Sequence, residues 1–182
     1  MAVPAGTSIR QLGTLPGSFE FNKKLSDSDD KMLDLQGIGW IMRQAIKHSG
    51  VTLNIHSKTD DKGVFHLDIE QIASGGYKNW EYRPMDWEVQ QKEDGAYGQI
   101  KLKSRFVDAS EIGNGFLKNG FSGEVINTYS ESVGLKGDQW QADQVWGIET
   151  VDGGPHYTRH IHFTRGNEVL DIRKVYDFKP TA

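Results

Sequence analysis

The sequence of 182 residues contains no cysteine. This excludes a disulfide framework, thiolate chemistry and cysteine-ligated metal or iron–sulfur sites. The chain also lacks any apolar run approaching the roughly 18 residues of a membrane-spanning helix. Residues 1–15 hold no continuous apolar core like that of a secretory signal. These absences predict a cytoplasmic protein without a membrane span.

An excess of positive charge is missing as well. The chain has 21 Lys and Arg against 25 Asp and Glu, a net charge of −4, and the two signs are interspersed. Without a basic stripe to follow a phosphate backbone, we expect no nucleic-acid partner. The length suits one domain with a sizeable core. We expect a flexible N-terminal arm at residues 1–15 and a single domain at residues 16–182.

One stretch near the start, LQGIGWIMRQAIKHSG at residues 35–50, has the periodicity of an amphipathic helix. Its apolar residues recur on one helix face at Leu35, Ile38, Met42, Ala45 and Ile46. The polar run at residues 25–32 predicts a first, shorter helix just before it. A pair of helices is therefore expected directly after a short strand at residues 17–24.

The rest of the chain has the two-residue period of β-strands, with turn signals such as TDDKG and DGGP between the runs. The predicted strands cover residues 51–57, 64–73, 80–91, 97–107, 122–133, 139–151, 156–166 and 168–179. Residues 111–120 form a long loop, with room for one helical turn. The pattern predicts an all-β fold: an antiparallel up-and-down β-barrel of about nine to ten strands, closed so that no edge is exposed, with a helix–turn–helix lid after the first strand.

This order of elements resembles the intracellular fatty-acid-binding proteins of the calycin superfamily. GSFEF at residues 17–21 stands where that family has its Gly-x-Trp strand, with Phe19 in place of Trp. LQGIGWIMRQAIK resembles the second lid helix, and KVYDFK resembles the terminal Arg-x-Tyr strand, with Lys174 in place of Arg and Tyr176 matching. The resemblance implies a lid whose apolar stripe faces a cavity for a small hydrophobic ligand. Lys lacks the bidentate fork that Arg offers a carboxylate, which is a departure from the family pattern.

A narrower resemblance joins the helix segment, the TDDKG turn at residues 59–63 and the RKVYDF end at residues 173–178. Together they are similar to fungal lipocalin-like proteins of natural-product gene clusters, among them pericyclases that close a linear polyene by an intramolecular Diels–Alder reaction. The resemblance implies a cofactor-independent cyclase of secondary metabolism. The alternative is a non-catalytic intracellular carrier of fatty acids or other small apolar ligands. Either activity suits a monomer or a homodimer.

The candidate site residues follow from the assumption that the more apolar or aromatic face of each strand points inward. Polar groups on such a face need partners, and a ligand carbonyl is one such partner. The candidate catalytic residues are Lys174, Tyr176, Arg159 and Gln71. For Lys174 the alternative is a cation stacked on the Phe19 ring at the base of the barrel. The candidate substrate-binding residues are Phe65, Leu67, Met85, Trp87, Phe106, Tyr129, Trp140, Gln144, Trp146 and Met42.

Other kinds of site have little support in the sequence. His156, His160 and His162 alternate along one predicted strand, but no carboxylate or fourth ligand has matching spacing, so a solvated strand face is the simpler interpretation and no metal is expected. The chain has no Gly-x-Ser-x-Gly nucleophile elbow. Its glycine-rich stretches do not join a strand to a helix in a βαβ unit, so no nucleotide, flavin or other cofactor is expected.

Overall fold

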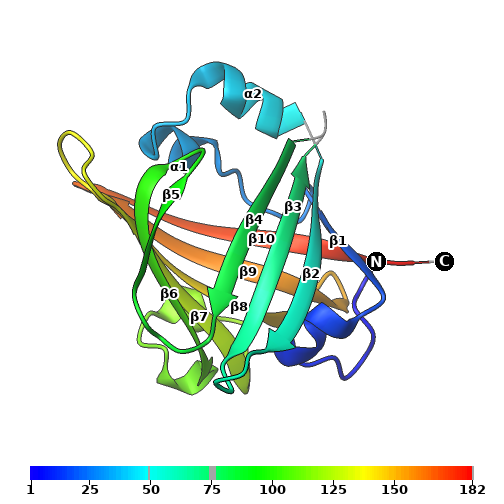
Figure 1. The fold of residues 1–182 in the computed structure, drawn as a ribbon. Helices are drawn as coiled ribbons and strands as arrows, with labels where there is room; N and C mark the ends of the chain where they lie inside the picture. Colours follow the sequence, from blue (N-terminus) through cyan, green and yellow to red (C-terminus); the bar gives the residue numbers. More distant parts are fainter. Residues whose placement is uncertain (49, 74–76, 182) are drawn as a thin grey trace.

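A computed structural model describes residues 1–48, 50–73 and 77–181 and shows a single ten-stranded sheet curled into a half-barrel (Figure 1). Its strand order is β4-β3-β2-β1-β10-β9-β8-β7-β6-β5, with every neighbouring pair antiparallel. The first strand thus pairs with the last, as an up-and-down meander requires when it curls onto itself. The predicted all-β fold is confirmed.

The bounds of the strands agree with most of the predicted runs. The strands are β1 (Gly17–Phe21), β2 (Val51–Thr59), β3 (Phe65–Ala73), β4 (Tyr77–Pro84), β5 (Gln90–Asp94), β6 (Gly98–Asp108), β7 (Glu124–Ser132), β8 (Trp140–Val151), β9 (Gly154–Arg165) and β10 (Glu168–Pro180). The short helical segments are η1 (Ile9–Thr14), α1 (Asp30–Leu35), α2 (Trp40–His48), η2 (Ala109–Glu111) and α3 (Gly115–Lys118).

The predicted closure of the barrel is wrong, because β4 and β5 stand at the two ends of the strand order and do not pair with each other in the described chain. The run at residues 80–91, predicted as one strand, is divided between them. Pro84 ends β4, since proline has no N–H to donate to a sheet. Trp87 then adopts a positive φ of 62°, which breaks the alternation of a regular strand, and its N–H donates to the Ser104 carbonyl oxygen of β6 at 2.9 Å before β5 begins. Figure 1 looks between β4 and β5 onto β9 and β10.

Helices α1 and α2 lie over one end of the half-barrel (Figure 1). The end of α2 is held by Lys23, which follows β1 and donates to the Lys47 carbonyl oxygen at 2.8 Å, and α1 is bonded to the sheet at both of its ends. Lys174 of β10 bonds to Asp29 at the start of α1, and Arg165 of β9 donates to the carbonyl oxygen of Leu35 at its end. Helix α2 follows a break at Gly37, where φ is +88°, and none of its side chains is buried. The helix pair is therefore confirmed, with its second helix standing off the barrel.

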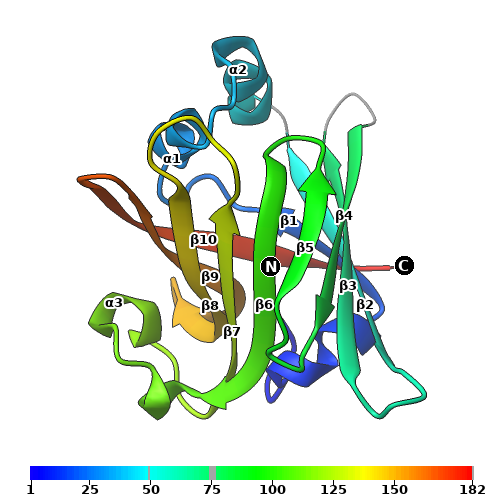
Figure 2. The ribbon, with the colours of Figure 1, turned by 60° about the vertical axis from the view of Figure 1, so that its left-hand side comes forward.

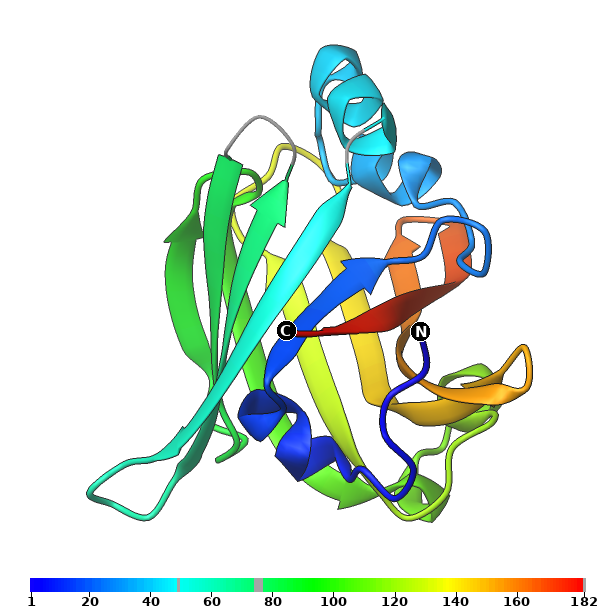
Figure 3. The ribbon, with the colours of Figure 1, turned by 90° about the vertical axis from the view of Figure 1, so that its right-hand side faces the viewer.

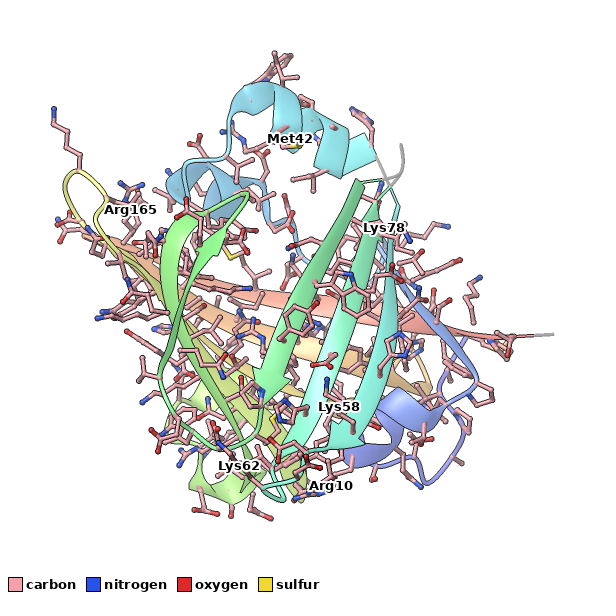
Figure 4. The ribbon with its side chains drawn as sticks, in the orientation of Figure 1. Arg10, Met42, Lys58, Lys62, Lys78 and Arg165 are labelled. Carbon is pink, nitrogen blue, oxygen red and sulfur yellow. The ribbon has the colours of Figure 1, made fainter. Side chains whose placement is uncertain are left out.

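The N-terminal segment, expected to be a flexible arm, is packed against the end opposite the lid (Figure 3). Val3, Ile9 and Leu12 are buried in the same core cluster as Phe19 of β1. Arg10 makes two 2.7 Å hydrogen bonds to the carboxylate of Glu124. Figure 4 shows Arg10 and Met42 at opposite ends of the molecule. Three apolar side chains buried together explain why this segment joins the core rather than extending into solvent.

Helix α3 covers the outer face of the sheet at β8 and β9 (Figure 2). Beneath it His160 is 2% exposed, with Nδ1 3.0 Å from the carbonyl oxygen of Phe116 and Nε2 3.0 Å from Glu149 Oε1. The solvated face predicted for the histidines is therefore wrong for His160, and His156 is likewise buried. This part of the sheet is covered on both sides because apolar residues of the segment after β6, such as Ile112 and Leu117, form a small core cluster with Val125 of β7 and Val145 of β8.

Candidate functional site

The inner side of the sheet carries a buried cluster of charges that joins strands far apart in the strand order. Glu81 of β4 lies between Arg83, two residues further along, and Arg159 of β9. The Glu81 carboxylate is 3.2 Å from Arg83 Nη2 and 3.3 Å from Arg159 Nη1. Arg83 Nη1 also donates to Thr128 Oγ1 of β7 at 3.2 Å. Because β4 pairs with no strand on its β5 side in the described part of the chain, these bonds connect it across the interior to β7 and β9.

Arg159 is surrounded by aromatic rings as well as by charge. The centre of its guanidinium lies 3.9 Å from the Trp146 ring centroid and 5.6 Å from that of Tyr176. Its Nε donates to the hydroxyl oxygen of Tyr157 at 2.9 Å. A cation stacked on rings in this way is held rigidly and stays attracted to them when water is excluded. Within the described chain its third nitrogen, Nη2, is buried and has no hydrogen-bond partner.

The charge states of this cluster follow from its mutual contacts. Burial alone raises the pKa of Glu81, but the charges of Arg159 and Arg83 outweigh burial and lower it to about 2. Burial lowers the pKa of Arg159, whereas Tyr157 and Glu81 raise it, and the net result lies above the ordinary arginine value. Burial raises the pKa of Tyr157, so its hydroxyl stays protonated. The interior therefore holds one carboxylate between two guanidinium groups.

Glu81 is expected to make the protein lose stability in acid. Its pKa is about 2 in the folded chain against an ordinary 4.5, so its stabilising contribution is present above pH 4.5 and is lost as the pH falls toward about 2. Urea unfolding of the wild type and of Glu81→Gln measures this, since the difference in unfolding free energy between them should shrink across that window. Glu20→Gln, on the outer face of β1, is the control. A difference that does not change with pH contradicts the assignment.

Several of the predicted site residues come together around this cluster. Gln71 of β3 donates its amide to Glu81, and Gln144 of β8 accepts a 2.9 Å hydrogen bond from Trp146 Nε1. Tyr176 stacks on Tyr157 with ring centroids 5.3 Å apart. Leu67 and Trp146 are fully buried in the same core cluster. The alternation of side chains thus predicted the inner face of β3, β8, β9 and β10.

Lys174 points inward but faces the lid rather than the charge cluster. Its Nζ lies 2.5 Å from Asp29 Oδ2, just before α1, and 5.7 Å from the ring centroid of Phe21. Burial lowers the pKa of Lys174, and the charge of Asp29 raises it, with a net rise. Lys174 is therefore a charged group already paired within the protein, and the ring near it is that of Phe21 rather than the expected Phe19.

Four further predicted lining residues lie near the two ends of the interior. Trp140 is in a second core cluster with Phe163, Ile172 and Met32 of α1, on the lid side. At the other end Phe65 and Phe106 meet edge to face at 5.3 Å, and the Arg10 guanidinium lies 3.8 Å from the Phe106 ring centroid. Met85 is half-buried and, like Phe65, packs against the core cluster that holds Phe19 and Trp146.

The predicted inward orientation is wrong for Trp87 and Tyr129. The Trp87 ring lies between Lys103 and Arg105, which alternate with the inward residues of β6 and so occupy its outer face. Tyr129 is opposite Lys103 in the same register and donates its hydroxyl to Glu131 at 2.8 Å. Both rings are therefore on the outside of the sheet. The assignment assumed that the more aromatic face of each strand points inward. On β7 this fails, because the inward residues on either side of Tyr129 are polar.

Met42 is also misplaced by the sequence prediction, since its side chain belongs to the exposed surface of α2. Trp40, Ile41 and Met42 are 66%, 80% and 53% exposed. The side of α2 turned toward the protein carries Arg43, which bonds to Asp30, Asp34 and the Ile38 carbonyl oxygen. Of the apolar stripe that was expected to face the interior, Ile38 is buried and Leu35 packs against a core cluster, whereas Met42 and Ala45 of α2 are exposed.

Sequence reasoning missed the residues that organise the cluster, Glu81 and Arg83 above all. A signal was present: Asn79, Glu81 and Arg83 alternate on one face of β4, and opposite charges two residues apart on an inward face imply a buried pair. The prediction began the strand at residue 80 and placed Arg83 on one face with Met85 and Trp87, but it did not choose Arg83 as a candidate site residue. Tyr157 was placed on the same strand face as Arg159, which is the inward one, but it was not chosen as a candidate site residue.

Two hollows lie near the lid. One of about 390 Å³ lies at the rim of β1, β2 and β3 and is lined by Glu20, Phe21, Gly50, Val51, Thr52, Ile72 and Ala73. The other, of about 590 Å³, runs along the apolar side of α2 between Gly39 and Ala45. Among the described residues no group of three or more His, Asp or Glu is placed to hold a metal ion. No helix in the described ranges is long and apolar enough to cross a bilayer.

Comparison with known proteins confirms the resemblance expected from the sequence. No protein-family model matches the chain. It is 26% identical over 186 residues to a probable pericyclase, scpY, of Mollisia scopiformis, covering 97% of this chain and 94% of that protein. It is 25% identical over 185 residues to the pericyclase pydY of an Acremonium species, covering 98% and 97%.

Solved structures similar to this one include proteins named for the transport or binding of fatty acids. A REP1-NXSQ fatty acid transporter matches with a TM-score of 0.53 at 14% identity, over 91% of this chain and 96% of that one. A fatty-acid-binding protein from Drosophila melanogaster brain matches with 0.52 at 14% identity, over 90% and 98%. A mutant of the fluorescent protein UnaG gives 0.54 at 14% identity, over 92% and 97%. At this identity the likeness concerns the fold, which is that of the fatty-acid-binding proteins.

Proposed function

We propose that this protein is a cofactor-independent pericyclase that closes a linear, polyketide-type polyene by an intramolecular Diels–Alder reaction on the inner side of the curled sheet. The observation that carries the proposal is the unpartnered Nη2 of Arg159, a buried donor held among aromatic rings. The full-length similarity to two proteins named pericyclases supports it.

The reaction requires only that the protein hold the substrate in its reactive conformation and donate one hydrogen bond to it. New carbon–carbon bonds form from the π electrons of a diene and a dienophile, and no atom, proton or electron is gained or lost. Holding a flexible polyene in its reactive fold reduces the barrier by orientation. A hydrogen bond to the carbonyl that activates the dienophile strengthens as charge develops on that oxygen, so it stabilises the transition state more than the substrate.

Each inward residue then has a distinct proposed role. Arg159 Nη2 donates to the substrate carbonyl, and the rings of Trp146, Tyr157 and Tyr176 shape the space beside it. Gln71 and Lys174 act as positioning residues, since each is already bonded to a carboxylate of the protein. Leu67, Gln144 and Trp140 are proposed as further parts of the lining.

The second candidate function is a non-catalytic carrier of small apolar ligands, which the fold of the fatty-acid-binding proteins favours. A carrier of this kind retains its ligand unchanged. The two candidates therefore differ in the fate of the bound molecule rather than in its polarity or size.

The purified protein is expected to convert a pathway intermediate into an isomer of equal mass. The test incubates it with an extract from a producing strain in which its gene has been deleted, followed by chromatography and mass spectrometry. Loss of a linear polyene together with gain of a cyclic isomer supports the cyclase. Recovery of every extract component unchanged, with one of them bound to the protein in native mass spectrometry, contradicts the cyclase and supports the carrier.

A further inference from the structure

The carboxylate of Glu81 occupies the position between two arginines where the carboxylate of an acidic ligand would otherwise bind. Two buried arginines from different parts of the sheet converge on it, and their side chains are 9% and 7% exposed, against 12% for Glu81. A pair of guanidinium groups aimed at one point is the arrangement that binds a carboxylate best. Here the protein supplies that carboxylate itself.

Both arginines already direct nitrogens at partners within the protein, with three of the five N–H groups of Arg83 and two of the five of Arg159 in hydrogen bonds. Arg83 directs Nε and Nη2 to Glu81 and Nη1 to Thr128. Arg159 directs Nη1 to Glu81 and Nε to Tyr157. Of the nitrogens of these two side chains, only Arg159 Nη2 has no hydrogen-bond partner among the described residues. Nη2 can donate to a carbonyl oxygen, whereas Nη1 beside it already donates to Glu81. A carboxylate that bound both nitrogens would therefore have to compete with Glu81 for Nη1.

The charges around the site work in the same direction. A ligand carboxylate at Arg159 Nη2 would lie close to the negative charge of Glu81, and like charges repel strongly where water is excluded. Lys174, a second inward cation, is likewise paired with a carboxylate of the protein, that of Asp29. A neutral ligand meets no such repulsion and still gains the hydrogen bond.

We propose that Glu81 is a specificity-determining residue: it keeps free carboxylic acids out of the interior and limits polar recognition to one neutral acceptor, such as a ketone, ester or amide carbonyl, at Arg159. The substrate class of the proposed cyclase is then a carbonyl-bearing polyene without a free acid group. The inference deepens the proposed function, but it concerns binding and can be measured without any turnover.

The test compares oleate with methyl oleate, which share one chain and differ in charge at the head group. Tryptophan fluorescence titration of the wild type is expected to show at least about tenfold tighter binding of the ester, given the cost of placing like charges together. Glu81→Gln is expected to gain at least about tenfold in affinity for oleate, because the two arginines lose their internal carboxylate. Glu81→Asp keeps the charge and should keep the preference for the ester.

Matched controls separate the inference from general effects of charge and folding. Glu168→Gln removes the same charge at the exposed start of β10, where Glu168 pairs with Lys31, and should leave both affinities unchanged. Should Glu81→Gln fail to fold, the affinities of the wild type and of Glu81→Asp for oleate and methyl oleate still test the inference. Equal affinity of the wild type for oleate and its ester overturns the inference, as does unchanged oleate binding in folded Glu81→Gln.

Failure of this inference and failure of the proposed function are distinguishable. If the protein excludes oleate but leaves every polyene unchanged, the cyclase proposal fails and the assignment of Glu81 stands. If it cyclises a polyene yet binds oleate as well as methyl oleate, the assignment of Glu81 fails and the cyclase stands.

Discussion

Arg159→Met is expected to lower the rate of cyclisation by about 100-fold, as removal of a single preorganised donor does at other sites of developing oxygen charge. The methionine keeps an apolar chain over Trp146 but removes the free nitrogen and its positive charge. Because the donor acts mainly in the transition state, the loss should fall on kcat more than on KM. Initial rates with purified polyene measure it.

The controls for this prediction distinguish donation from structure. Arg105→Met removes a guanidinium from the outer face of β6, where it lies over Trp87, and should leave the rate unchanged. Arg159→Lys keeps the positive charge but replaces the planar guanidinium group by a single ammonium group, so an intermediate rate is expected. Circular dichroism shows whether each variant is folded. An Arg159→Met variant that is folded and retains the full rate contradicts the role given to Nη2.

Leu12→Ala is expected to reduce the free energy of unfolding by about 2–5 kcal/mol, the range for removing a large apolar side chain from a packed core. Leu12 is 1% exposed and belongs to the core cluster that holds Phe19 and Trp146. Urea denaturation followed by tryptophan fluorescence measures the change. Thr14→Ala, at an exposed position of the same short helix, should change the value by no more than about 0.5 kcal/mol. Equal stability of Leu12→Ala and the wild type would mean that the N-terminal segment is the flexible arm predicted from the sequence.

The order of elements could be predicted because each carries a strong local signal. Alternation on β9, with Tyr157, Arg159, Ile161 and Phe163 on one face, identified the inward set and with it the key cation. Turn residues marked the hairpins of the second half of the sheet. These signals come from neighbouring residues, and the structure confirms them where the strand is regular.

Errors arose where the chain departs from a regular strand. Trp87 was counted on the inward face because residues 80–91 were treated as one strand, but Pro84 and the positive φ of Trp87 break the alternation. The segment containing Ile9 and Leu12 was predicted to be a flexible arm because it is short and shows no extended helical or strand periodicity. Its capping box, Ser8 with Gln11, was a local signal of helical structure that the prediction did not use.

The pair of Glu81 and Arg83 has a local signal on β4, but its contact with Arg159 could not be predicted from local pattern. Glu81 and Arg159 are on strands that are not neighbours in the sheet, and only the curl of the sheet brings them together. A sequence shows that each strand has a polar inward residue, but it does not show which of them meet. The same holds for Lys174 and Asp29, whose contact depends on where α1 docks.

The most direct measurement of the central claim is a time course of one purified linear polyene, with and without the protein, followed by chromatography that resolves the diastereomeric products. A cyclase is expected to accelerate the disappearance of the polyene in proportion to protein concentration, with many turnovers per protein and a single diastereomer of unchanged mass. The same rate and the same mixture of diastereomers as in buffer alone would contradict catalysis by this interior.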